Sequence, residues 1–144
     1  MRSCTFIGHK DCPQEIKEKL CETVEDLIVN SDVRRFYVGT HGSFDRLAYK
    51  VLCDFESKYE IEIIVVLSYL YHKKDVYYDL SKTVFPEEVD KADKKYAIIR
   101  RNEFMIKRSQ VLVCYVNNMV SNSYKYMTQA LKKGLRVINI SDVV

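Results

Sequence analysis

Three of the four glycines in the sequence stand where an apolar segment runs into a helical pattern, at residues 8, 39 and 42. Basic or hydroxyl side chains follow them, at residues 9–10 and at residue 43. Glycine lacks a Cβ and lets a ligand approach the backbone, while the start of a helix offers free N–H groups and a positive dipole end. The pattern favours a site for a phosphate-bearing or otherwise anionic small molecule. The alternative is that these glycines only end strands and begin turns.

Arg101 is a charged residue on an apolar helical stripe. It recurs with Ala97, Ile98 and Met105 at spacings of three and four residues, so its side of the helix should face inward. A buried guanidinium needs an acidic partner or an anionic ligand. Three interpretations are open at this stage: a ligand contact, an internal salt bridge with an acid such as Asp45, or a side chain that reaches back to solvent.

Other kinds of chemistry find little support in the residue patterns. The glycines do not form the G-x-G-x-x-G dinucleotide fingerprint. No Ser/His/Asp or Cys/His set stands at a suggestive spacing, and the three histidines show no metal-ligand spacing with the five cysteines. We therefore expect no metal and no cofactor.

Hydrophobic periodicity supplies the elements that must position these residues. Strands are expected at residues 3–8, 35–39, 61–68, 110–116 and 135–140, and helices at about residues 11–28, 43–55, 96–109 and 123–133. This alternation predicts an α/β fold, a three-layer Rossmann-like, doubly wound parallel sheet of about five strands with helices on both faces. We expect one domain over residues 1–144, with a long, lid-like connection at about residues 69–95. Ligands of such sheets bind beyond the carboxyl ends of the strands.

Composition narrows the classes of partner. The chain has 144 residues and a net charge of +3, too small an excess to suggest a nucleic-acid surface. Its longest apolar run, residues 63–71, is too short to cross a membrane, which takes about 20 residues. The five cysteines are odd in number and contain no C-x-x-C pair, which favours reduced thiols and a cytoplasmic location.

Four motifs in this order resemble a known family. They are Cys4-Thr5-Phe6-Ile7-Gly8-His9-Lys10, Gly39-x-x-Gly42-x-Phe44-Asp45, Tyr78-Asp79 with Pro86, and Arg101-Asn102-x-x-Met105-Ile106 followed by Ser109. Together they look like the YpsA-like branch of the SLOG superfamily, over nearly the whole chain. The resemblance implies a Rossmann-like fold that binds nucleotides or nucleotide-derived ligands such as relatives of ADP-ribose. Carried over by position, the pocket residues would be Gly8, His9, Gly39, Gly42, Asp45 and Arg101.

The chain departs from that family after its fourth expected strand. Relatives carry a Gly-Gly pair there, and the phosphoribohydrolases among them add a catalytic Glu. This chain has neither Gly nor Glu over residues 116–123. The polar residues 121–123 can still donate hydrogen bonds at a helix start. The missing carboxylate points to binding rather than catalysis.

We therefore expect non-catalytic binding or sensing of a nucleotide-like ligand, and a possible homo-oligomer. The candidate ligand-binding residues are Gly8, His9, Lys10, Gly39, Gly42, Ser43, Asp45, Arg101, Ser121 and Ser123. One alternative is a nucleotide N-glycosidase in which Asp45 or Asp79 supplies the missing acid. Another is a ligand-free scaffold that acts through protein contacts made by residues 69–95.

Overall fold

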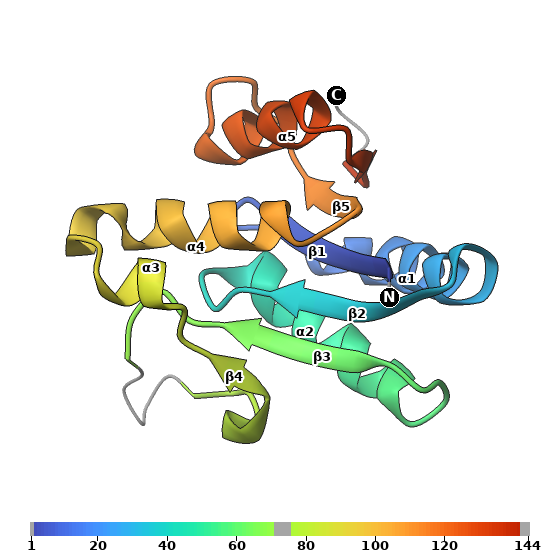
Figure 1. The fold of residues 1–144 in the computed structure, drawn as a ribbon. Helices are drawn as coiled ribbons and strands as arrows, with labels where there is room; N and C mark the ends of the chain where they lie inside the picture. The colour runs from blue at the N-terminus through green and yellow to red at the C-terminus, as the bar shows by residue number, and fades with distance from the viewer. Residues whose placement is uncertain (1, 71–75, 142–144) are drawn as a thin grey trace.

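The computed structural model describes residues 2–70 and 76–141. Its centre is a six-stranded sheet in the order β4-β3-β2-β1-β5-β6, and every neighbouring pair is parallel (Figure 1). The strands are β1 (Arg2–Gly8), β2 (Val33–Val38), β3 (Glu62–Val66), β4 (Thr83–Val84), β5 (Val111–Tyr115) and β6 (Arg136–Asn139). The α-helices are α1 (Lys17–Ser31), α2 (Ser43–Glu56), α3 (Glu87–Asp90), α4 (Ala97–Lys107) and α5 (Asn122–Lys132). Short 3₁₀ helices occupy Gln14–Ile16, Leu80–Lys82 and Lys94–Tyr96.

The predicted Rossmann-like, doubly wound α/β fold is confirmed, but the expected count of five strands is wrong. The sixth strand, β4, lies inside the connection at residues 69–95 and pairs with β3 through Val65 and Val66. Hydrophobic periodicity does not detect this strand, because two residues are too few to show alternation. The same connection carries α3 and two 3₁₀ helices. Its residues 71–75 lie outside the described residues.

Helices cover both faces of the sheet. Helices α1 and α2 pack on one face, where they meet the side chains of Val111 and Val113. Helices α4 and α5 pack on the other face, against Leu112 and Cys114. Successive side chains of β5 therefore point to opposite hydrophobic layers, and the whole strand is buried. No helix in the described part of the chain is long and apolar enough to span a membrane.

The strand order reverses between β1 and β5. From β1 the chain builds outward through β2, β3 and β4, and it then returns to add β5 and β6 on the other side of β1. The loops that leave neighbouring strands at such a reversal go to opposite faces of the sheet, and a crevice opens between them. Here the loop after β1 leads toward α1 and the loop after β5 leads into α5, on the other face.

Candidate functional site

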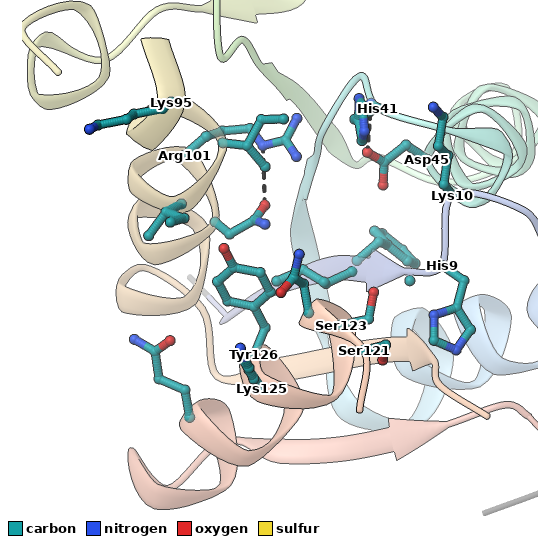
Figure 2. Close-up of a pocket in the computed structure, with 18 residues that line it drawn as sticks. His9, Lys10, His41, Asp45, Lys95, Arg101, Ser121, Ser123, Lys125 and Tyr126 are labelled. Carbon is teal, nitrogen blue, oxygen red and sulfur yellow. Dashed lines mark hydrogen bonds between the residues drawn. The ribbon is translucent and has the colours of Figure 1, made fainter. Parts of the chain in front are cut away.

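A cavity of about 600 Å³ lies at this reversal, beyond the carboxyl ends of β1 and β5 and beside α4 (Figure 2). Seven of the ten residues expected from the sequence line it: Gly8, His9, Lys10, Asp45, Arg101, Ser121 and Ser123. They come from six segments: the end of β1, the loops after β1 and β5, and the helices α2, α4 and α5. Gly39, Gly42 and Ser43 do not line the cavity, and their places in the structure are described below.

Arg101 is the most unusual of the lining residues. It is 3% exposed, so its side chain does not reach back to bulk solvent. The Nε atom donates a hydrogen bond to Oδ1 of Asn102 at 3.1 Å. The Nη1 atom is buried and has no hydrogen-bond partner among the described residues. Arg101 also forms no ion pair with any residue that the structure describes, so the internal salt bridge to Asp45 is absent.

Asp45 is the acidic residue of the cavity wall. It is 5% exposed, and its Oδ2 atom accepts a hydrogen bond from the backbone N–H of His41 at 2.9 Å. Burial raises the pKa of this carboxyl to about 6, although the charge of Arg101 and the N–H of His41 both act to lower it. Asp45 therefore holds a proton much more readily than an exposed aspartic acid does.

The two glycines after β2 pack closely against residues that line the cavity. Gly39 lies directly against the ends of the Arg101 and Asp45 side chains, which a Cβ at this position would displace. Gly42 is the N-cap of α2 with a φ of 93°, and a Cβ there would lie 2.6 Å from Cα of Lys10. Close packing therefore favours glycine at position 39, and Gly42 is required both by the nearby backbone of Lys10 and by its own backbone conformation.

Ser43 is occupied by hydrogen bonds within the protein. Its N–H and its hydroxyl both donate to the carbonyl oxygen of Lys10, at 2.7 and 2.9 Å. Its Oγ atom also accepts from the N–H of Cys12 at 2.8 Å. Ser43 begins α2, whereas Gly42 is the cap. These bonds join the loop after β1 to the start of α2.

His9 makes the matching connection to the loop after β5. Its Nε2 atom accepts a hydrogen bond from the backbone N–H of Asn117 at 2.9 Å, and its ring meets Tyr115 edge-on. Because Nε2 accepts, the neutral imidazole carries its proton on Nδ1. Further along, Ser121 caps α5 by accepting from the N–H of Tyr124 at 3.1 Å. The first turn of α5, with Ser123, therefore faces the cavity in a fixed orientation.

Cationic side chains outnumber acidic ones around the cavity. Four cationic side chains line it, and Asp45 is the one acidic residue in its described wall; the cations are Lys10, Lys95, Arg101 and Lys125. The pKa of His41 is lowered, first by burial and then by the charges of Arg101 and Lys10. A positive field in a concave site attracts anions.

Several lining residues were missed at the sequence level, among them Lys95, Asn102, Lys125 and Tyr126. Lys125 lies four residues beyond Ser121, so it comes back to the same side of the helix after one turn. That spacing could have indicated it. Asn102 belongs to the Arg101-Asn102-x-x-Met105-Ile106 motif, but its residue type alone did not mark it as a cavity contact. No group of three or more metal-ligating side chains occurs within residues 2–70 and 76–141.

Comparisons with known proteins give information about the fold alone. No family model matches the chain, and no curated protein matches it. The chain is similar in structure to DNA processing protein A (DprA) from Streptococcus pneumoniae, known from an X-ray structure. The TM-score is 0.66 and the sequence identity is 13%. The fold of this chain is therefore similar to that of part of DprA. The similarity covers 94% of this chain and 49% of the DprA chain, so this chain spans about half the length of that protein. DprA is a member of the SLOG superfamily, and at this identity the likeness concerns architecture alone.

Proposed function

We propose that this protein binds a nucleotide or nucleotide-derived anion, such as a relative of ADP-ribose, in the cavity at the β1–β5 reversal. The observation that carries the proposal is Arg101, a buried guanidinium that lines the cavity and whose Nη1 atom has no partner among the described residues. An unpaired buried charge costs several kcal/mol, on the order of 3–5 where a partner has been removed. A phosphoryl oxygen bound at Nη1 would remove that cost.

The remaining walls suit such a ligand. A volume of about 600 Å³ falls within the range of about 300–1,000 Å³ that is typical of small-molecule sites. Apolar side chains of Ile7, Ile98 and Ile99 stand among the cations, so one part of the ligand can be apolar and another anionic. We also propose that the chain belongs to the YpsA-like branch of the SLOG superfamily, on the motifs given above.

The binding is proposed to be non-catalytic because the loop after β5 offers no carboxylate, its residues 116–123 being free of Asp and Glu. One observation favours the N-glycosidase as a second candidate: Asp45 lies in the cavity wall with a pKa of about 6, in the range of a general acid. Asp79 is a weaker source of that acid, because it is exposed and accepts from the N–H and hydroxyl of Ser81.

Thermal unfolding with a panel of probes tests the proposal. The panel contains AMP, ADP, ADP-ribose and a single-stranded DNA oligomer, and each incubated sample is then analysed for free base. We expect ADP or ADP-ribose to raise the Tm, the DNA to have no effect, and no base to be released. A wild-type Tm that no nucleotide shifts would contradict the proposed function. Base release that is lost in Asp45→Asn would favour the glycosidase.

A further inference from the structure

Asp45 and Arg101 are close neighbours in the wall of the cavity. The place that a Cβ on Gly39 would take lies 2.6 Å from Nη1 of Arg101 and 2.8 Å from Oδ2 of Asp45, so these two atoms are no further apart than the sum of the distances. They nevertheless form neither a hydrogen bond nor an ion pair. In Figure 2 the guanidinium reaches from α4 toward Asp45, whose carboxyl points back from α2. A ligand atom bound to Nη1 therefore lies beside the carboxyl of Asp45.

The two oxygens of the Asp45 carboxyl differ in their surroundings. Oδ2 accepts the hydrogen bond from the backbone N–H of His41. Oδ1 has no hydrogen-bond partner among the described residues and is not fully buried, so it is the oxygen that a ligand in the cavity can reach. A protonated carboxyl has one O–H donor and keeps acceptor capacity on its other oxygen. Because Oδ2 accepts from His41, the proton of a neutral Asp45 belongs on Oδ1.

The charge of Asp45 decides how this part of the wall receives an anion. Two anionic groups that share one buried site cannot both stay ionised without a large cost, so one of them takes up a proton. A phosphate diester is a strong acid and stays ionised at neutral pH, whereas Asp45 is 5% exposed and burial raises its pKa to about 6. The proton therefore goes to Asp45. The neutral carboxyl removes the repulsion and adds a charge-assisted hydrogen bond to the anion, and bonds of this kind are the strong ones.

We propose that Asp45 binds the phosphoryl group of the ligand as a neutral carboxylic acid, with the hydroxyl on Oδ1 donating a hydrogen bond to a phosphoryl oxygen. One proton passes from the solvent to Asp45 when the ligand binds, and it returns to the solvent when the ligand leaves. This inference rests on the proposed function and makes Asp45 a ligand donor beside Arg101. Binding is therefore coupled to pH, and it weakens as the solution becomes more alkaline.

Other titratable groups near Asp45 determine the controls. His9 and His41 also line the cavity, and histidines are the side chains that ordinarily titrate near neutral pH. The pKa values of the Cys12 thiol and the Tyr77 phenol are raised, in each case first by burial, so both groups stay neutral up to pH 8. The cations nearest to Asp45 come from the loop after β1, from α2 and from α4, and they are Lys10, Arg46 and Arg101.

Calorimetric titration of ADP-ribose at pH 6, 7 and 8 tests the proposal, because both phosphates of ADP-ribose are diesters whose charge is constant over this range. The affinity of the wild type should fall about fiftyfold from pH 6 to pH 8, in proportion to the fraction of Asp45 that is protonated. Titrations at pH 7.5 in buffers of different ionisation enthalpy should show uptake of about one proton per ligand. Asp45→Asn has the shape of the neutral acid, so it should bind equally at all three pH values and more tightly than the wild type at pH 8.

Two further variants separate the hydrogen bond from the repulsion. Asp45→Ala should also lose the pH dependence, but it lacks the donor and should bind about tenfold more weakly than Asp45→Asn. Asp54→Asn is the matched control, since Asp54 is an exposed aspartate on the same helix, α2, and does not line the cavity. The control should show the affinity and the pH dependence of the wild type.

The outcomes distinguish this inference from the proposed function. Wild-type binding of ADP-ribose that is constant from pH 6 to pH 8, or that takes up no proton, would overturn the role of Asp45 and leave the proposed function standing. A pH dependence that persists in Asp45→Asn would also overturn it, because the proton would then belong to His9 or His41. Absence of ADP-ribose binding at every pH would overturn this inference, and absence of binding by every nucleotide would overturn the proposed function as well.

Discussion

Arg101 and Asp45 approach each other across the α-carbon of Gly39 without forming an ion pair. A Cβ on Gly39 would lie 2.6 Å from Nη1 of Arg101 and 2.8 Å from Oδ2 of Asp45. Two buried side chains of opposite charge thus share one small space, yet one keeps an unpaired donor and the other an elevated pKa. This arrangement leaves Nη1 of the guanidinium without a hydrogen-bond partner among the described residues.

Gly39→Ala is predicted to impair binding more than folding. The added methyl group must displace the ends of the two side chains, and overpacking of this kind costs about 1–3 kcal/mol. Because the displaced atom of Arg101 is its proposed ligand contact, ADP-ribose affinity should fall by about tenfold or more. Gly134→Ala is the control, since Gly134 has a φ of 86° but no atom within 4 Å of the place that a Cβ would take. It should lower stability by about 1 kcal/mol and leave binding intact. Equal binding by both variants would contradict the prediction.

Asp45 predicts a dependence of stability on pH. Its pKa is about 6 in the folded protein, whereas that of an unperturbed aspartic acid is 3.8, so between these values the folded chain keeps a proton that the unfolded chain has released. The free energy of unfolding should therefore fall as pH rises through this window, by on the order of 3 kcal/mol from this residue, and remain lower above pH of about 6.

Urea unfolding of the wild type and Asp45→Asn at pH 4, 5, 6 and 7.5 isolates that contribution, because all other titrating groups are shared. The variant lacks the ionisation, so it should gain stability relative to the wild type as pH rises and the difference should level off above pH of about 6. A difference that is constant across the whole range would show that the fold does not raise the pKa of Asp45.

Ser43→Ala is predicted to destabilise the fold and to leave binding largely unchanged. The substitution removes the hydrogen bonds of the Ser43 hydroxyl to Lys10 and Cys12 but keeps the backbone N–H bond to Lys10, and loss of the hydroxyl bonds costs about 1–3 kcal/mol. ADP-ribose affinity should stay within about threefold of the wild type. The control is Ser57→Ala, which removes one exposed bond to the carbonyl of Asp54. Urea unfolding and calorimetry give the two quantities. A tenfold loss of affinity at unchanged stability would make Ser43 a ligand contact.

The sequence indicated the fold well because its signals are local and repeated. Five of the six strands are marked by apolar runs, and the four long helices are marked by apolar residues at helical spacing. The edge strand β4 lacks such a signal: its two residues depend on pairing with β3, a contact that is remote in sequence. The glycine positions indicated the edge of the sheet at which the cavity lies, although only Gly8 lines it.

The same reasoning was less complete for the roles of single residues. It located Arg101 on the inner stripe of α4, because a charge among apolar residues stands out in the sequence. It could not separate Ser43, whose hydrogen bonds stay within the protein, from Ser123, which faces the cavity. It also did not select Asn102 and Tyr126 as site residues, although both line the cavity. Distinctions of this kind depend on tertiary geometry.

The central claim is that the unpaired guanidinium of Arg101 binds an anionic ligand. Calorimetric titration of ADP-ribose into the wild type, Arg101→Ala and Arg100→Ala tests it most directly. The two variants remove the same charge from adjacent positions, but Arg100 is exposed and pairs with Glu103 on the surface. We predict that Arg101→Ala weakens binding by about a hundredfold, on the order of 3 kcal/mol, and that Arg100→Ala binds within about threefold of the wild type. Equal affinities for the two variants would contradict the account.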